Sequence, residues 1–461
     1  MLNTILEPPR EIALVDDYDV VVAGGGTAGI IATVAAARNG MRVLLLERSG
    51  FLGGHIASQL LEHSAGWFDA IGRRIVGGLP GELVDRLKEA GASPGHVRDD
   101  TGYTKFRVPV NHEAFKSVVT EWIAEAGADF LLFSPVCRVL TGDGRIAALV
   151  VENKSGRTAY AAKAVVDCTG DADVAALAQC RFLGSGETGQ TQPVSLLFKI
   201  GGLNFSDILD YVEHNPQDFK LGVKLEELRG EPYVNLWGFG QCLRRAHDDG
   251  VLSFRRAELH FAGIVAEREA VINLTRYAID ATDSKALAEA ERALRRQVLE
   301  CVAFFRRYVP GCAKAHLVAT ASCVGVRESR RIEGLYTLKD DDVRAGRHFE
   351  DDVVLGGFPI DSHDPKGASM DGAEHVPQAY GIPYRALVPQ AVDGLLVAGR
   401  CISAERRALA SARITGTCMA MGQAAGTAAA LAIVSGSGTH RLDVGRLQER
   451  LGDQGAIFRL G

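Results

Sequence analysis

The stretch that decides the fold is Asp19-Val-Val-Val-Ala23-Gly24-Gly25-Gly26-Thr27-Ala28-Gly29, close to the start of the 461-residue chain. Its β-branched first half predicts a buried strand. The Ala-rich residues 30–39 predict a helix that Gly40 closes. Residues 41–46 form a second apolar strand, which ends at Glu47. This order of strand, GxGxxG, helix, strand and acid indicates a dinucleotide-binding βαβ unit.

The glycines and the helix start of this unit each have a physical reason. Gly24 permits a tight turn, Gly26 lets the backbone approach a pyrophosphate, and Gly29 allows the helix to pack closely on the strand. The first helical residues, Thr27 and Ala28, offer unbonded N–H groups and the positive end of the helix dipole to phosphates. We therefore expect all five residues to contact or position a dinucleotide.

The composition excludes several classes of protein. Hydrophobic residues make up 47% of the chain, a globular value that argues against a disordered or fibrous protein. A net charge of −6 argues against a nucleic-acid partner. The nine cysteines show no CxxC or Cys/His spacing, which favours reduced cytoplasmic thiols and no metal site. Residues 419–434 are apolar but rich in Ala and Gly, so we expect a buried helix and no membrane association.

A second glycine pair follows the βαβ unit and favours FAD over NAD. Glu47 lies 18 residues beyond the last glycine of the motif, where a carboxylate can bind ribose hydroxyls. Arg48-Ser-Gly-Phe-Leu-Gly53-Gly54-His55 comes directly after it. This resembles the GG motif of FAD-binding flavoproteins of the glutathione-reductase superfamily, with His55 in place of the usual Arg. The resemblance implies that all five numbered residues contact FAD.

Two further segments resemble strands that contact FAD in the same superfamily. Residues 164–173 resemble a strand that ends in an ATG turn, and residues 394–401 resemble a later strand that ends in glycine. In the superfamily a helix then points its N-terminus at the flavin, and here that helix runs from Gly416 to about residue 434. Most relatives carry an acid where Arg400 stands. The resemblance implies FAD contacts from Thr169, Gly170, Asp171, Gly399, Arg400, Gly416 and Thr417.

Four later motifs make the resemblance specific. They are residues 327–332, 359–365, 382–389 and 396–404, and together with the glycine motifs they resemble the FAD-dependent oxidoreductase family from about residue 18 to 434. Many members are dehydrogenases whose substrates are unknown. The resemblance implies FAD, redox chemistry and a glutathione-reductase-type, Rossmann-like α/β domain with an inserted α+β substrate domain.

Changes in pattern along the chain predict its organisation. We expect a discontinuous FAD-binding domain over residues 16–195 and 385–435, a substrate domain over 196–384, and a C-terminal extension over 436–461. Helices are predicted at 111–125 and 284–307 from apolar residues at three- to four-residue spacing, and a hairpin turn at 141–144. Residues 67–109 are expected to be loop-rich. A second GxGxxG match, residues 184–189, has no helix after it and is interpreted as a loop.

Four residues are candidates for the chemistry. His55 could contact the cofactor, act as a base or form a covalent link to flavin. His363 lies between two aspartates that could tune a general base, although a polar loop explains it equally well. Tyr384 precedes a strand that returns to the flavin. Arg330 belongs to a charge cluster that either binds an anion or forms structural ion pairs. Cys401 and the other cysteines are expected to be structural.

The leading hypothesis is oxidation of a small molecule at a C–OH or C–N bond, with hydride transfer to flavin N5. An alternative is reduction of an activated C=C bond, as in fumarate reductase, with an arginine supplying the proton. A third is a protein in which FAD is structural. Only one credible nucleotide unit is present, so no separate NAD(P)H domain is expected. The sequence leaves open whether the chain forms a homo-oligomer.

Overall fold

The computed structural model describes residue 5 and residues 7–184, 191–364 and 370–460, with residues 370–373 as backbone. The loop predicted at 184–189 therefore lies outside the described residues, apart from Gly184. The predicted βαβ unit is confirmed. Strand β2 (Val20–Ala23) is fully buried, helix α1 (Thr27–Arg38) follows the glycine loop, and β3 (Val43–Leu46) pairs parallel to β2. A Cβ at Gly29 would clash with the Gly24 carbonyl oxygen, so glycine is needed for this close packing.

A five-stranded parallel sheet forms the centre of the larger part of the molecule. Its order is β23 (Leu395–Val397), β11 (Ala164–Asp167), β2, β3 and β7 (Asp129–Leu131). Counted along the chain the order is 5-4-1-2-3, the Rossmann arrangement read from the opposite edge. The α/β fold class predicted from the sequence is confirmed. The carboxyl ends of these strands meet at one edge, and the order reverses between β2 and β11.

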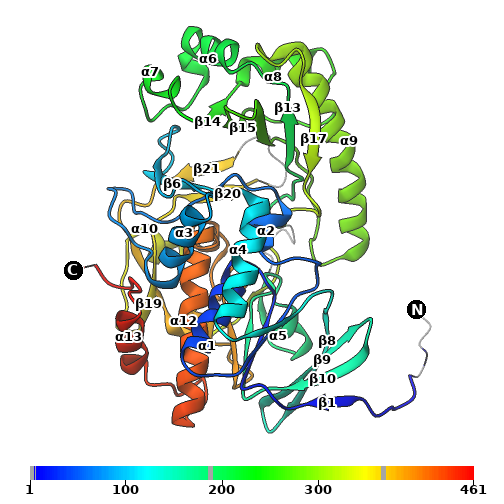
Figure 1. Cartoon of the computed structure of the whole chain (residues 1–461), viewed down its shortest axis with the longest axis vertical. Helices are drawn as coiled ribbons and strands as arrows, with labels where there is room; N and C mark the ends of the chain where they lie inside the picture. Colours follow the sequence, from blue (N-terminus) through cyan, green and yellow to red (C-terminus); the bar gives the residue numbers. More distant parts are fainter. Residues whose placement is uncertain (1–4, 6, 185–190, 365–369, 461) are drawn as a thin grey trace.

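Helix α12 (Thr415–Ser435) is the long Ala/Gly-rich helix that the sequence predicts, and it packs along α1 (Figure 1). It is long and apolar enough to cross a membrane by length and composition, yet 78% of its most apolar window is buried inside the structure. Gly422 and Gly426 face the backbone of Ala28 and Ala32 on α1. These small residues let the two helices approach closely, as expected of a core helix.

A four-stranded sheet, a three-stranded sheet and several helices complete the part of the chain before residue 184. Asn111 caps α4 through hydrogen bonds from the Glu113 and Ala114 N–H groups, which confirms the helix predicted there. The predicted hairpin is also confirmed, because β8 and β9 pair antiparallel. The expectation of a loop-rich segment at 67–109 is wrong in its middle, where α3 forms. The elements are β1 (Ala13–Val15), α2 (Gly54–Ser58), β4 (His63–Ser64), α3 (Gly78–Glu89), β5 (Val97–Arg98), β6 (Phe106–Pro109), α4 (His112–Glu125), β8 (Val136–Gly142), β9 (Arg145–Asn153), β10 (Gly156–Ala161), α5 (Asp173–Leu177) and β12 (Phe182–Leu183).

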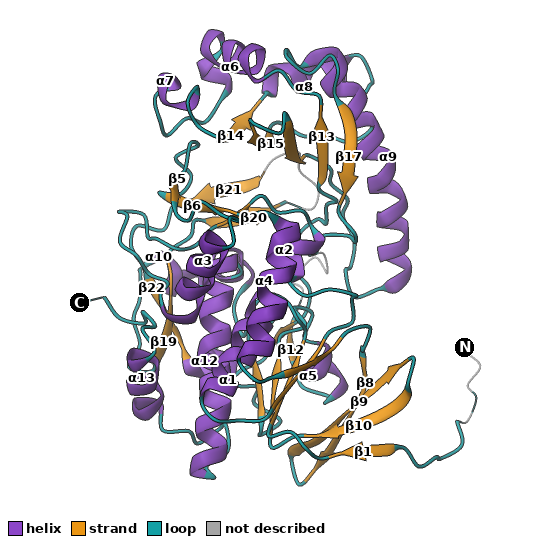
Figure 2. Ribbon diagram, viewed as in Figure 1, coloured by secondary structure: helices purple, strands orange, loops and turns teal. Residues whose placement is uncertain are grey.

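A second, antiparallel sheet stands above the first in Figure 2, in the order β14-β15-β16-β13-β17. Helix α9 runs along its side and confirms the helix predicted at 284–307, with Asp283 as its cap. The elements are β13 (Phe198–Gly201), α6 (Phe205–His214), a 3-10 turn (Pro216–Asp218), α7 (Leu225–Leu228), β14 (Tyr233–Gly238), α8 (Gly240–Asp248), β15 (Leu259–Ile264), β16 (Glu269–Asn273), α9 (Ser284–Tyr308) and β17 (His316–Thr320).

The chain then returns to the parallel sheet. One buried core gathers apolar residues from 20–180 and 332–451, and another gathers those from 194–326. The division into domains at residues 196 and 384 stays a prediction. The remaining elements are β18 (Arg331–Ile332), α10 (Asp340–Arg344), β19 (Asp352–Gly356), β20 (Ile360–His363), β21 (Met370–Glu374), β22 (Tyr380–Pro383), a 3-10 turn (Tyr384–Leu387), α11 (Arg406–Ala412) and α13 (Val444–Asp453).

Candidate cofactor and substrate cavity

A cavity of about 970 Å³ opens at the carboxyl ends of the parallel strands, near the top of the roughly 300–1,000 Å³ range of ligand pockets. It includes the point between β2 and β11 where the strand order reverses, which is where ligands bind in such sheets. We call its strand-end lining the glycine wall, which consists of Gly24, Gly26, Thr27, Ala28, Glu47, Arg48, Gly54, His55, Thr169, Gly170, Asp171, Gly399 and Arg400.

The loop after β2 leaves its backbone facing the cavity. Gly24 has a φ of +98°, and a Cβ there would lie 2.5 Å from the Cys168 carbonyl oxygen, so only glycine lets β2 turn this close to β11. Helix α1 starts at Gly26 with no side chain capping its first N–H groups. Since Thr27 and Ala28 line the cavity, these N–H groups are available to an anionic ligand.

Glu47 holds the loop in place from the end of β3. Its side chain accepts hydrogen bonds from the Gly25 N–H at 2.6 Å and from the Ser49 N–H at 2.7 Å. The residue is only 9% exposed and still lines the cavity. A carboxylate has further lone pairs, so Glu47 can support the loop and accept from ligand hydroxyls as well.

The second glycine pair lies against the first. Gly53 donates its N–H to the Gly25 carbonyl oxygen at 2.9 Å, and Gly54 begins α2 opposite the Cα of Gly26. Gly53 supports the loop without lining the cavity. His55, the next residue, does line it. Burial and the charge of Arg400 lower the pKa of His55 to about 3, so its ring is neutral at pH 7.

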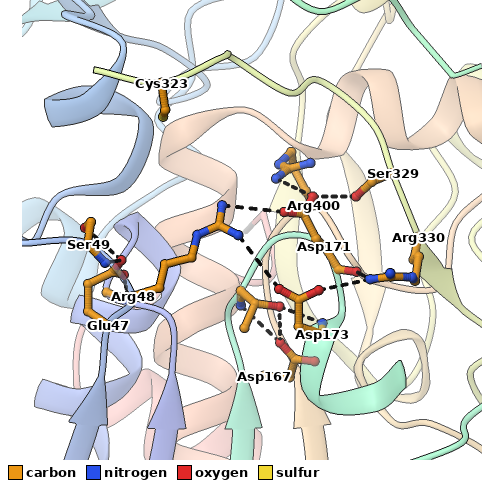
Figure 3. A network of polar contacts seen from close by, with 12 residues as sticks. Glu47, Arg48, Ser49, Asp167, Asp171, Asp173, Cys323, Ser329, Arg330 and Arg400 are labelled. Carbon is orange, nitrogen blue, oxygen red and sulfur yellow. Dashed lines mark hydrogen bonds and ion pairs between the residues drawn. The ribbon is translucent and has the colours of Figure 1, made fainter. Parts of the chain in front are cut away.

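The charged residues of the glycine wall neutralise one another (Figure 3). Asp171, after β11, accepts hydrogen bonds from the Ser329 hydroxyl at 2.6 Å and from Arg400 Nη2 at 3.0 Å. Although burial opposes it, Arg400 holds the pKa of Asp171 below its usual range. Arg400, which follows β23, is thus paired with Asp171 from the end of the neighbouring strand β11.

Arg330 belongs to the same network of charged side chains. Its Nη1 donates to Asp173 Oδ1 at 2.9 Å and to the Asp171 carbonyl oxygen at 3.0 Å. Arg48 reaches Asp171 and Asp173 only at 3.8 and 3.9 Å and remains 66% exposed. Arg330 thus orders the turn after β11, and its direct part in the chemistry stays a prediction.

The start of α12 is the second uncapped helix end on the cavity. No side chain caps it at Ile414, and Thr415 and Cys418 line the cavity. The cavity lining does not include the predicted Gly416 and Thr417. Gly416 donates its N–H to the Ala65 carbonyl oxygen at 2.9 Å, so it fastens the helix to the chain before α3.

These features fit FAD. Two helix N-termini without side-chain caps, a glycine loop that lines the cavity, and an acid at the end of β3 suit a long dinucleotide with a pyrophosphate. In the described part of the chain, no cluster of three or more His, Cys, Asp or Glu side chains could hold a metal ion.

Another part of the cavity lining comes from residues that are far apart in the sequence. We call it the arginine wall, and it consists of Asn273, Arg327, Asp361, His363 and Arg413. His363 Nε2 lies 3.2 Å from Asp361 Oδ1, and Arg413 Nη2 donates to the Asp361 carbonyl oxygen at 3.0 Å. Burial and the charge of Arg327 lower the pKa of His363 to about 4, against the opposing effect of Asp361. The structure thus joins the predicted His363 to a carboxylate and two arginines.

Other predicted residues lie elsewhere. The Tyr384 hydroxyl donates to the Thr439 carbonyl oxygen at 2.9 Å, and the cavity lining does not include this buried ring. Burial raises the pKa of the Cys401 thiol well above its usual value, in keeping with a structural role. The exposed Cys323, which the sequence did not single out, lines the cavity beside Gln59.

Two further residues of the arginine wall, Asn273 and Arg413, were not predicted from the sequence. Asn273 ends a strand of the second sheet, and no motif marks it. Arg413 caps the end of α11 and lies two residues before α12, so its position near a predicted helix start was the one signal that could have found it.

The Rossmann sheet and the glycine wall define a flavoprotein that binds FAD at the carboxyl ends of its parallel strands. A family model described as FAD dependent oxidoreductase matches residues 19–451. The chain belongs to this family, which confirms the resemblance. The protein is therefore an enzyme that uses FAD in oxidation and reduction.

Individual proteins are similar to the chain at 31% identity or below. Over 160 residues the chain is 31% identical to digeranylgeranylglycerophospholipid reductase 1 of Methanopyrus kandleri, covering 33% of this chain and 40% of that protein. The match thus spans about two-fifths of that relative. A geranylgeranyl bacteriochlorophyll reductase-like protein from Thermoplasma acidophilum has a TM-score of 0.48, with 13% identity over 97% of this chain and 85% of the other. For p-nitrophenol 4-monooxygenase from Pseudomonas putida the TM-score is 0.46, with 12% identity over 96% and 85%.

Proposed function

We propose that this FAD-dependent oxidoreductase oxidises a small molecule at a C–OH or C–N bond. The observation that carries the proposal is the pair of the buried His363 and the half-buried Asp361, which lines the same cavity as the glycine wall. When bound, FAD supplies the hydride acceptor at flavin N5. Oxidation of an alcohol or amine also requires a group that removes a proton from oxygen or nitrogen.

His363 is suited to take that proton. With its pKa lowered to about 4, the ring is neutral at pH 7 and has a free lone pair. The carboxylate of Asp361, 3.2 Å away, would stabilise the imidazolium that forms. His363, Arg327 and Arg413 hold Asp361 in its charged form, since they keep its pKa below the usual range although burial opposes them.

A second candidate is reduction of an activated C=C bond, with an arginine supplying the proton. One observation favours it: burial and the nearby charge of Arg413 lower the pKa of Arg327 to about 9, which makes this guanidinium a better proton donor. The Methanopyrus relative is also named a reductase.

Anaerobic reduction of the bound FAD distinguishes the two. The purified holoenzyme is mixed with a panel of alcohols, hydroxy acids, amines and amino acids, and the flavin absorbance is followed. Bleaching by at least one C–OH or C–N compound is expected. If none bleaches the flavin, while chemically reduced enzyme is reoxidised by activated alkenes, oxidation is excluded and the reductase candidate takes its place.

Several other features belong to the same proposal. We infer an FAD-binding domain over residues 16–195 and 385–435, a substrate domain over 196–384 that supplies Asn273, Arg327 and His363, and an extension over 436–461. Nine free thiols support a cytoplasmic location. His55 is proposed to contact FAD as a neutral ring. Among the predicted catalytic residues, His363 is favoured over Tyr384 and Arg330.

A further inference from the structure

The arginine wall carries more positive than negative charge. Its ionised side chains are Arg327, Arg413 and Asp361, because His363 is neutral at pH 7 and Asn273 carries no charge. Two guanidinium groups and one carboxylate leave a net charge of +1. The glycine wall differs, because its charged side chains are two acids, Glu47 and Asp171, and two arginines, Arg48 and Arg400, whose charges sum to zero.

The excess positive charge of the arginine wall comes from Arg327. The guanidinium donates Nη1 to the Pro193 carbonyl oxygen at 2.8 Å and Nη2 to Asn273 Oδ1 at 3.5 Å. Both partners are neutral, and no carboxylate in the described part of the chain forms an ion pair with it. Burial, followed by the charge of Arg413, lowers its pKa to about 9, which shows that the surroundings resist the positive charge. A half-buried cation without a counter-ion is costly unless a ligand supplies one.

The hydrogen-bond donors of Arg413 are only partly used by the protein. Its side chain is 11% exposed and shares Asp361 with His363, donating Nη2 to the carboxylate at 3.4 Å. Its Nε is buried and has no hydrogen-bond partner among the described residues. One carboxylate therefore serves both a histidine and an arginine, and a donor of Arg413 is left over.

Resting on the proposed function, we propose that the substrate is a hydroxy or amino carboxylate whose carboxylate group binds to Arg327 and Arg413. Guanidinium groups bind carboxylates through two parallel hydrogen bonds. A bound carboxylate would give Arg327 the ion-pair partner that its neutral contacts, Pro193 and Asn273, do not supply. Since His363 shares Asp361 with Arg413, the bound carboxylate brings the neighbouring hydroxyl or amino group toward His363.

The test compares probes of equal shape and different charge on the FAD-loaded protein. Propionate with propionamide, and benzoate with benzamide, are titrated by calorimetry and by the thermal shift of the holoenzyme. Each carboxylate is expected to bind at least about tenfold more tightly than its amide, a difference of about 1.4 kcal/mol. In Arg327→Gln and Arg413→Gln this preference is expected to disappear while the affinity for the amides is unchanged.

Two further variants control the test. Arg307→Gln makes the same change in net charge on α9 at a 63% exposed side chain outside the cavity, and should keep the full preference. Arg327→Lys retains the charge without the planar fork, so an intermediate preference is expected even if Arg327→Gln does not fold. Equal binding of carboxylate and amide to the wild type, or an unchanged preference in all the Arg327 and Arg413 variants, would overturn the inference.

The outcomes separate this inference from the proposed function. If neutral alcohols or amines bleach the flavin and carboxylates have no advantage, the oxidase or dehydrogenase activity stands and the carboxylate site is excluded. If carboxylates bind through the arginines but no C–OH or C–N compound bleaches the flavin, the carboxylate site is supported and the proposed oxidation is excluded.

Discussion

The glycine wall and the arginine wall line one cavity but are built in opposite ways. The glycine wall uses backbone: glycine turns and the starts of α1 and α2 beside the ends of parallel strands, with Asp171 and Arg400 paired inside the protein. The arginine wall uses side chains from four distant segments and leaves one positive charge uncompensated. A cofactor site can thus be complete before its ligand arrives, whereas the substrate site depends on its ligand for charge balance.

The largest expected effect comes from breaking the backbone of the glycine wall. In Gly29→Ala the new Cβ would clash with the Gly24 carbonyl oxygen and lie 3.2 Å from the Cys168 side chain. We expect bound FAD to be lost and the apoprotein to be destabilised by about 1–3 kcal/mol. The flavin-to-protein ratio and chemical denaturation measure the two effects.

Gly452→Ala is the matched control for that substitution. A Cβ at Gly452 meets no atom within 4 Å on the surface helix α13. This variant should keep its FAD and be as stable as the wild type, or more stable by about 0.4–1 kcal/mol. Full FAD content in Gly29→Ala would mean that the loop can rearrange and that its backbone geometry is not required.

The second-largest expected effect is a loss of turnover when the proposed proton acceptor of the arginine wall is removed. His363→Asn removes the proposed proton acceptor but keeps a neutral polar group, so turnover is expected to fall by about 10²- to 10⁴-fold. The FAD content should not change, because His363 lies outside the glycine wall. His214→Asn, an exposed histidine at the end of α6, should leave turnover unaffected. A fall of less than about tenfold in His363→Asn would exclude it as the acceptor.

The pH dependence of turnover tests the charges around His363. It accepts a proton only when neutral, and with a pKa of about 4 it stays neutral well below the value near 6.5 of an ordinary histidine. The acidic limb of kcat/KM, which reports the free enzyme, is therefore expected near pH 4. Arg327→Gln removes a charge that lowers this pKa, so the limb should move to higher pH. A limb near pH 6.5 in the wild type would contradict this environment.

The two walls also differ in how far the sequence could predict them. Gly24, Gly26 and Glu47 stand in fixed order within one βαβ unit, so local spacing was enough to predict the Rossmann sheet and to place most of the proposed FAD contacts on the lining of one cavity. Local spacing cannot tell which residue faces a ligand when tertiary packing decides it. Gly416 was therefore assigned to the cofactor although it faces Ala65. Nor can spacing predict that Asp361 and Arg413 would meet, since they belong to separate segments.

The smallest expected effect is at the edge of the glycine wall. Arg48 is 66% exposed and reaches Asp171 and Asp173 only at 3.8 and 3.9 Å. Ion pairs of this kind contribute about 0–1 kcal/mol, so Arg48→Gln should weaken FAD binding by less than about fivefold. Arg400 is the buried comparison, with 12% exposure and a 3.0 Å contact to Asp171.

Arg400→Gln leaves the buried Asp171 without its main counter-charge, so its FAD affinity should fall by at least about tenfold. Fluorescence titration of the two variant apoproteins with FAD compares their affinities for the cofactor. A loss in Arg48→Gln as large as in Arg400→Gln would mean that Arg48 binds the cofactor directly. In that case the charges of the glycine wall would not be fully paired within the chain, and the contrast with the arginine wall would lie in geometry alone.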